Sequence, residues 1–371
     1  MIDPSTRSAE ATSSVRISCA VMSHPDRAEA ARRLADSLPE LSPAVVTDPS
    51  PEGPPTTLRT SLAAWAAAPE GATHHLVLQD DAEPCSGMVE ALTRMVTAHP
   101  ERVLSLFCEW GSGTATMARW AALGGYGLAE CADRYVPTVG ILMPTPLARR
   151  LVASVPPEGR EEEPDDEATA RFLEGIGRPA LVTVPNLIEH DGDLSLVGNA
   201  HRMGVRRSVL LREKGDPAPS PRVLRAPARV PFMSWRRARA SIVRRDTDRG
   251  VYDRHDGLVR AEAERSGTSR RSVVEALDLW LDTAEAGRRL EGALGYGTTY
   301  ELWLTAAVTA LWAPIPTADL RSPTPAARRA LRTLAPGGLR TAVPEVLTDA
   351  GLRADLDALV GAAHDFGVAH R

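Results

Sequence analysis

Lysine is nearly absent from this chain: of its 43 basic residues only Lys214 is lysine, which we attribute to genomic base composition rather than mechanism. Cysteine is scarce as well, and its four positions are Cys19, Cys85, Cys108 and Cys131. None of them has the close spacing of a metal-binding pair, so the sequence argues against a zinc site and against a disulfide framework. Cys19 and Cys108 lie in or beside apolar segments, where we expect buried core residues.

Long apolar runs are lacking too. Residues 1–14 are polar and rich in serine and threonine, without the apolar stretch of a secretion signal. The longest apolar segment, Leu302 to Ala313, is interrupted by two threonines and is too short to span a bilayer. We therefore expect a cytoplasmic protein with no transmembrane segment.

The composition that remains suits a large folded protein. With 371 residues, 43% of them hydrophobic, the chain can bury one large core or two smaller ones. The net charge of -5 argues against nucleic-acid binding by the chain as a whole.

The N-terminal half alternates between strand-like and helix-like segments. We expect strands over residues 16–22, 44–48, 74–79, 102–107, 136–144 and 180–185. We expect helices from Arg27 to Leu38, around Arg59 to Trp65, and over residues 88–98 and 146–155. This alternation indicates an α/β sheet with parallel neighbouring strands.

The strand that begins at His74 ends in two adjacent carboxylates, Asp80 and Asp81, and Glu83 follows. Ligands of open α/β sheets bind at the carboxyl ends of the strands. Adjacent carboxylates repel each other, and a hard cation such as Mg²⁺ or Mn²⁺ would neutralise them. The alternative is a turn whose solvated acids cap the helix that follows.

A second acidic segment holds seven acids and one arginine between Glu158 and Glu167. Its end, Asp165-Asp166-Glu167, runs directly into a helix-like segment. Acids at a helix N-terminus are stabilised by the helix dipole, and this structural role is enough to account for them. A third segment, Glu189-His190-Asp191-Gly192-Asp193, follows the last strand of this half.

Taken in order, these three segments resemble those of GT-A type glycosyltransferases, in particular the bacterial lipopolysaccharide-type sugar transferases. The resemblance covers roughly residues 15–199 and implies a GT-A-like, Rossmann-like α/β domain. It implies a nucleotide-sugar donor and a divalent cation, Mn²⁺ or Mg²⁺, with Asp81 and His190 as metal ligands. Asp80 would lie against the ribose or behind the metal ligands. The chain has Gln79 where the family commonly has a glutamate, which removes one acid.

The resemblance also implies roles for residues around the metal. The family's nucleotide contacts fall on Ser23, His24 and Arg27, and an arginine in the position of Arg59 can pair with the diphosphate. Each of these four residues can equally be a solvated residue at a helix end. In inverting enzymes a carboxylate before the helix is the general base, which makes Asp166 the first candidate and Glu167 the second.

From Val205 to Arg249 there are thirteen basic residues against four acidic ones, with five prolines. We interpret residues 205–256 as a basic connector between a catalytic domain of residues 1–204 and a helical domain of residues 257–371. Its arginines could hold phosphates and its Trp235 could stack on a base. The segment could equally cover acidic faces of the catalytic domain, or lie near anionic lipid or near the nucleotide diphosphate.

Two helices around a Ser-Gly-Thr-Ser turn, Leu258 to Leu281, are similar to the helical part of ribbon-helix-helix DNA-binding proteins. Those proteins read DNA with a strand before the helices, and Arg249 to Asp256 lacks the alternation of a strand. We therefore expect a sugar transferase acting on an unidentified acceptor. The alternative is a regulatory or binding protein with a degenerate transferase fold, in which residues 205–281 contact nucleic acid or a partner.

Overall fold

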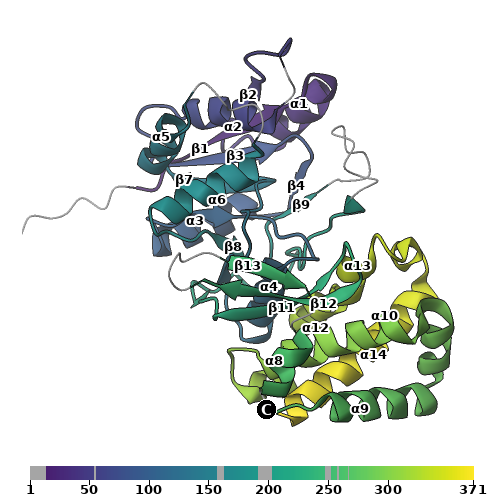
Figure 1. The fold of residues 1–371 in the computed structure, drawn as a ribbon. Coiled ribbons are helices and arrows are strands. Elements are labelled where there is room, and N and C mark those ends of the chain that lie inside the picture. Colours follow the sequence, from purple (N-terminus) through teal and green to yellow (C-terminus); the bar gives the residue numbers. More distant parts are fainter. Residues whose placement is uncertain are drawn as a thin grey trace, which may run out of the picture.

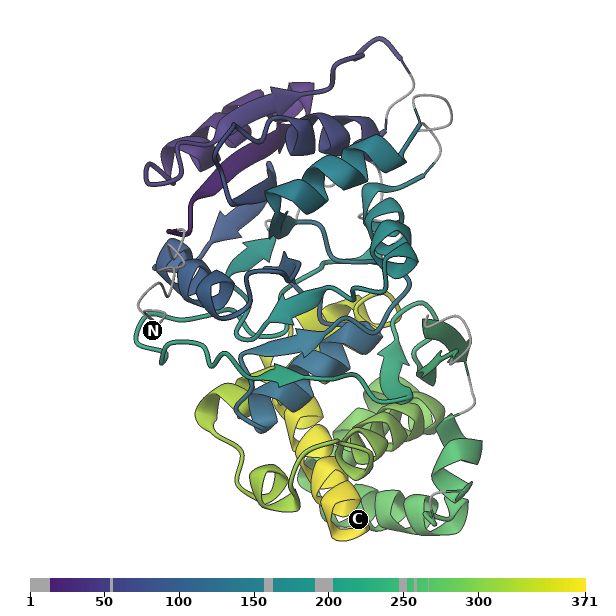
Figure 2. The same cartoon turned by 90° about the vertical axis from the view of Figure 1, so that its left-hand side faces the viewer.

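The computed structural model describes residues 14–53, 56–156, 163–190, 203–246, 252–256, 259–265 and 267–371. Figure 1 shows an α/β part formed by the first half of the chain and a helical part formed by its last third. A small sheet lies between them. After a quarter turn, Figure 2 shows the twisted strands of the α/β part above and the green-to-yellow C-terminal helices below. No helix in the described ranges is long and apolar enough to cross a membrane.

Eight strands form the central sheet. They are β1 (Ile17–Ser23), β2 (Ala44–Thr47), β3 (His74–Gln79), β5 (Leu104–Ser105), β6 (Leu128–Glu130), β7 (Gly140–Pro144), β8 (Leu181–Thr183) and β10 (Val223–Leu224). Their order is β10-β6-β8-β5-β7-β3-β1-β2. The β1–β2, β1–β3, β5–β8 and β6–β10 pairs are parallel, whereas β7 runs antiparallel to both β3 and β5, and β6 runs antiparallel to β8. The predicted α/β class is confirmed, and the sheet is mostly parallel.

Helices cover both faces of this sheet. They are α1 (Ala28–Asp36), α2 (Thr57–Ala66), α3 (Met88–Ala98), α4 (Gly113–Leu123), α5 (Thr145–Ser154) and α6 (Asp165–Gly175), with a 3₁₀ turn, η1 (Pro25–Arg27), before α1. Successive side chains of a strand point to opposite faces. Val77 of β3 therefore belongs to the apolar cluster that includes residues of α2, α4, α5 and α6, while Leu76 and Leu78 belong to the cluster that includes residues of α1 and α3. Burial on both faces explains the continuous apolar run Leu76-Val77-Leu78 within β3.

Two smaller sheets complete the strand arrangement. A two-stranded antiparallel ribbon joins β4 (Ala82–Pro84) to β9 (Ile188–His190). A three-stranded antiparallel sheet contains β11 (Arg229–Ser234), β12 (Arg239–Arg245) and β13 (Tyr252–Asp256). The described part of residues 205–256 contains β10, β11, β12 and β13, so the predicted linker-like character does not hold for these strands. The expectation that no strand precedes the helix pair is also wrong, because β13 lies there, paired with β12.

The C-terminal part is helical, as the sequence predicted. Its helices are α8 (Val259–Arg265), α9 (Arg270–Thr283), α10 (Glu285–Leu311), α11 (Thr317–Arg321), α12 (Pro325–Arg332), α13 (Leu334–Leu339) and α14 (Ala350–Ala369), with a 3₁₀ turn, η2 (Pro344–Leu347). Gly295, at φ +73°, kinks α10. Helices α10 and α14 approach closely at Gly367, where a Cβ atom would lie 2.1 Å from the Ala307 carbonyl oxygen.

Buried polar contacts join the two parts. The Trp120 indole of α4 donates a 2.7 Å hydrogen bond to the Thr309 carbonyl of α10. Arg340 and Glu109 form a buried ion pair at 3.1 Å. The apolar cluster on the α4 face of the central sheet also continues to Ala310 and Val368. The helical part is thus packed directly on the α/β part, and the division of the chain into three domains stays a prediction.

Candidate functional site

The carboxyl ends of β1, β2 and β3 lie together at one edge of the central sheet. These strands are parallel neighbours, with Ser23 beside Thr47 and Met22 beside Gln79. His24, Asp48 and Asp80 follow the three strands directly. The topology therefore gathers three polar residues at the edge where open α/β sheets bind ligands.

Asp80 is bonded to the segment that follows β1. The His24 backbone N–H donates to its Oδ2 atom at 2.8 Å, and the Arg27 guanidinium lies 3.4 Å from its Oδ1 atom. Burial raises the pKa of the Asp80 carboxyl, and the His24 N–H opposes this rise. Asp80 thus links the ends of β1 and β3. Its carboxyl group is held by the protein rather than exposed to open solvent.

Asp81 lies between an arginine and a histidine. Arg27 Nη1 donates to Asp81 Oδ2 at 2.8 Å, and His190 Nε2 is 3.4 Å from the same oxygen. The other oxygen, Oδ1, is buried without a hydrogen-bond partner. A buried carboxylate oxygen without a donor is costly, so a ligand that contacts Oδ1 would be favoured there.

His190 reaches Asp81 because β9 pairs with β4, with His190 opposite Ala82. Its side chain is only 3% exposed. Burial lowers the pKa of the imidazole, although the Asp81 charge opposes the change. Arg206 donates to His190 Nε2 at 3.0 Å, which makes Nε2 an acceptor, and Nδ1 is buried without a partner. The neighbouring residues 191–195 lie outside the described residues.

A divalent cation fits these residues in one way. Asp81 offers the buried Oδ1 atom, which has no hydrogen-bond partner. His190 would offer Nε2 once the Arg206 guanidinium moves off it, because Nδ1 carries the ring proton while Nε2 accepts from Arg206. The described ranges contain no group of three or more His, Cys, Asp or Glu side chains arranged for a metal. Mg²⁺-type ions are commonly held by one or two carboxylates, waters and substrate phosphates. The residues therefore suit a cation completed by a phosphate ligand, not a closed protein cage.

The predicted base residues lie at the start of α6. Asp166 is half-buried and its Oδ1 atom accepts a 2.8 Å hydrogen bond from the Glu167 N–H. Burial, followed by the charge of Asp165, raises the pKa of Asp166 to about 6. Glu167 is exposed to solvent. A half-buried carboxyl with this pKa is better suited to accept a proton near neutral pH than a solvated one is.

Hydrogen bonds connect the start of α6 to the end of β3. The Gln79 side chain donates to Thr138 Oγ1 at 3.3 Å, and the Thr138 hydroxyl also lies against Asp165. The Val136 N–H donates to the Asp166 carbonyl at 3.3 Å. Thr138 precedes β7, whose antiparallel course begins at the carboxyl end of β3. The acids of α6 therefore belong to the same edge of the sheet as Asp80 and Asp81.

Two predicted nucleotide contacts have other partners in the structure. Arg59 directs its planar fork at Asp48, with two N–H···O distances of 2.6 Å. The Ser23 side chain is buried, and its hydroxyl donates to the His24 carbonyl at 3.2 Å. Their roles toward a diphosphate or nucleotide stay predictions. The half-exposed His24 side chain accepts from the Asp26 N–H and caps η1, which positions Arg27.

Three residues at this edge of the sheet were not predicted as site residues from the sequence. Asp48 follows β2 as Asp80 follows β3, and this shared position at strand ends could have indicated it. Arg206 belonged to the basic segment, but nothing in the sequence placed it against His190. Thr138 gave no signal at all, because its contact with Gln79 depends on the pairing of β3 with β7.

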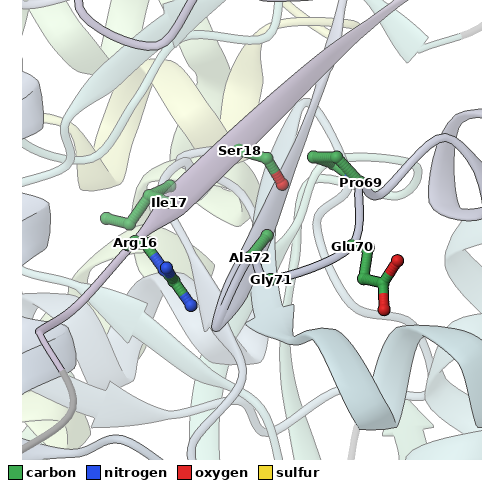
Figure 3. Close-up of a pocket in the computed structure, with 7 residues that line it drawn as sticks. All are labelled: Arg16, Ile17, Ser18, Pro69, Glu70, Gly71 and Ala72. Atoms are coloured by element: carbon green, nitrogen blue, oxygen red, sulfur yellow. The ribbon is translucent and has the colours of Figure 1, made fainter.

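A separate hollow of about 250 Å³ lies at the opposite end of β1. Figure 3 shows Ser18 and Ala72 in this hollow, with the charged groups of Arg16 and Glu70 at its two sides. It contains none of the predicted site residues. The start of β1 pairs with the start of β3, so the hollow lies at the amino edge of these strands, away from the acids.

No protein-family model matches this chain, and no curated protein matches it in sequence. The glycosyltransferase family suggested by the sequence therefore stays a prediction.

Proposed function

We propose that this protein is a glycosyltransferase that moves a sugar from a nucleotide-activated donor to an acceptor hydroxyl, with a divalent cation at the donor diphosphate. The GT-A-like character of the α/β part belongs to the same proposal. The observation that carries it is the meeting of Asp81 and His190 at the carboxyl end of β3, where the buried Oδ1 atom of Asp81 lacks a hydrogen-bond partner.

The donor would lie along the carboxyl edge of β1 and β3. Asp81 and His190 would hold the cation, and the cation, when bound, neutralises charge that develops on the departing diphosphate. Asp80 is fixed by the His24 N–H and by Arg27, so it keeps the end of β3 in place under the donor. Arg27 contributes a further positive charge beside the diphosphate position.

Transfer also requires removal of a proton from the acceptor. The acceptor oxygen would form the new bond to the anomeric carbon while the bond from that carbon to the diphosphate oxygen breaks. The proton of the acceptor hydroxyl would pass to the Asp166 carboxylate. With a pKa of about 6, this carboxyl is largely ionised at neutral pH and still basic enough to act.

A second candidate is a protein that binds the same nucleotide without turnover. It is favoured by Arg27, which already pairs with both Asp80 and Asp81, and by the replacement of an expected acid by Gln79. Such a protein would use the edge of the sheet as a regulatory ligand site. The two candidates differ in whether a nucleotide-sugar is consumed.

The experiment is a thermal-shift panel of nucleotide-sugars, each with and without Mn²⁺, followed by detection of released nucleoside diphosphate. A ligand present at a hundredfold excess over its Kd stabilises the native state by about 2.7 kcal/mol. We expect one nucleotide class to raise the melting temperature more strongly with Mn²⁺ and then to be consumed. Binding without consumption favours the second candidate, and no shift with any nucleotide contradicts both.

A further inference from the structure

Arg206 differs from three other arginines of low solvent exposure, Arg27, Arg59 and Arg340. Arg27 pairs with Asp80 and Asp81, Arg59 pairs with Asp48, and Arg340 pairs with Glu109. Arg206 is half-buried too, but no carboxylate in the described part of the chain pairs with it. Its hydrogen bond goes to the uncharged acceptor Nε2 of His190. Among the described residues, no acidic side chain is therefore paired with this guanidinium.

The backbone fixes Arg206 in this position. On one side, the Trp110 indole donates to the Val205 carbonyl at 3.1 Å, and the Trp110 N–H donates to the Arg207 carbonyl at 3.0 Å. On the other side, Glu189 accepts from the Ser208 N–H at 2.8 Å and from its hydroxyl at 2.7 Å. The segment that carries Arg206 is thus held directly beside β9, the strand that ends in His190.

Three guanidinium groups lie near the His190 ring, those of Arg206, Arg27 and Arg207. Asp80 and Asp81 both pair with Arg27, so two carboxylates there face one guanidinium. Arg206 supplies a second positive charge, which makes these four groups neutral together without giving Arg206 a carboxylate partner among the described residues. Its N–H donors can therefore bond an anionic ligand. Arginine presents a planar fork of N–H donors that matches phosphate oxygens.

We propose that Arg206, with Arg27, binds the donor diphosphate directly, so that part of the affinity for the nucleotide does not depend on a divalent cation. This inference rests on the proposed function and extends it. The cation and the two arginines would contact different oxygens of one diphosphate. Arg206 would change partners from the His190 ring to a phosphate oxygen, and the ring nitrogen would then be available as a metal ligand.

The test is calorimetric titration of the full-length protein with uridine, guanosine, adenosine and cytidine diphosphates, in EDTA and in Mn²⁺. We expect one of them to bind weakly in EDTA and more tightly in Mn²⁺. Arg206→Gln should weaken binding in EDTA by about 10- to 100-fold, the usual worth of hydrogen bonds to a charged group. Arg206→Lys, which keeps the charge but not the fork, should weaken it less.

Arg94→Gln is the matched control, because Arg94 lies on α3 in an exposed pair with Glu90 and should leave both affinities unchanged. Circular dichroism confirms that each variant is folded. The inference would be overturned if the wild-type protein bound no nucleoside diphosphate in EDTA. It would also be overturned if Arg206→Gln bound the nucleoside diphosphate in EDTA as tightly as the wild type does. In both cases Mn²⁺-dependent binding would leave the proposed function standing. If no nucleoside diphosphate binds in either condition, the proposed function itself is contradicted.

Discussion

Replacement of Asp166 by asparagine should make the protein more stable and nearly inactive. The Asp166 carboxyl is half-buried at the start of α6, next to the buried carboxyl of Asp165. Its pKa is raised to about 6 from an ordinary value of 3.8. The folded protein therefore holds an ionised group where a neutral one would be favoured, a condition that is common among catalytic groups.

The size and the pH range of this effect follow from the pKa. A rise of roughly two pKa units corresponds to about 3 kcal/mol at 1.36 kcal/mol per unit. Solvent reaches part of the side chain, so we expect the asparagine variant to gain about 1 to 3 kcal/mol at pH 7. Above about pH 6 the carboxyl is ionised in both states and the full penalty applies. Below about pH 4 it is protonated in both states, so the difference between the two proteins should disappear.

Activity should change in the opposite direction. General-base catalysis is usually worth about two to four orders of magnitude, so turnover of Asp166→Asn should fall by that factor while donor affinity stays the same. In the wild type, kcat/KM should rise with pH through about 6 as the carboxyl ionises. The asparagine variant should lack this rise.

The assays are urea denaturation at pH 4 and pH 7 and a pH profile of diphosphate release. Glu167→Gln is the matched control, since Glu167 is exposed at the next position and should change neither stability nor turnover greatly. An Asp166→Asn variant with full turnover would refute the assignment and move the role to Glu167 or elsewhere. An equal loss of donor affinity would instead mark Asp166 as a donor contact or a helix cap.

Two further predictions concern the C-terminal part. Arg340→Met should lower the free energy of unfolding by about 3 to 5 kcal/mol in urea titrations, because Glu109 would stay buried without its counter-ion. The control Arg94→Met, which breaks an exposed ion pair, should lower it far less. Equal losses in the two variants would contradict the reasoning. Full-length protein should bind duplex DNA weakly at about 50 mM salt and lose that binding at about 200 mM, as non-specific phosphate contacts do. Sequence-selective binding in an anisotropy titration at the higher salt would favour the regulatory alternative.

Strongly patterned segments of the fold could be predicted from the sequence. Helix α3 occupies Met88–Ala98, the predicted range, because its apolar residues recur on one face and bury Leu92 and Met95. Strands β1 and β3 were predicted because each contains a run of apolar residues, Cys19 to Met22 in β1 and Leu76 to Leu78 in β3. Helix α4 was missed because nearly all of its residues are buried, so the sequence shows no polar face and no helical period.

Short strands were harder to predict. The ribbon of β4 and β9 has three residues in each strand, and its pairing joins distant parts of the chain. Strand β12 carries arginines at its ends around the buried Ala240 to Val243, so its charge suggested a solvated connector. In both cases the stabilising contacts are long-range and leave little trace in the local sequence.

The candidate site was predictable in outline. Asp80, Asp81 and His24 lie at one edge because parallel strands deliver their carboxyl ends to the same side, a consequence of topology that the pattern already indicated. The partners of these residues were not predictable. Whether Arg27 covers both acids, or Arg59 directs its fork at Asp48, depends on how the segments pack after the strands have formed.

The most direct test of the proposed function is the Mn²⁺ dependence of nucleoside diphosphate binding in the wild type and in Asp81→Asn, measured by calorimetry. The variant replaces the carboxylate that contacts Arg27 and His190 with an isosteric amide, so the fold should be retained. We predict that Mn²⁺ strengthens binding in the wild type and that this gain is lost in Asp81→Asn. An equal gain from Mn²⁺ in both folded proteins would contradict the assignment of Asp81 to a metal-assisted diphosphate site.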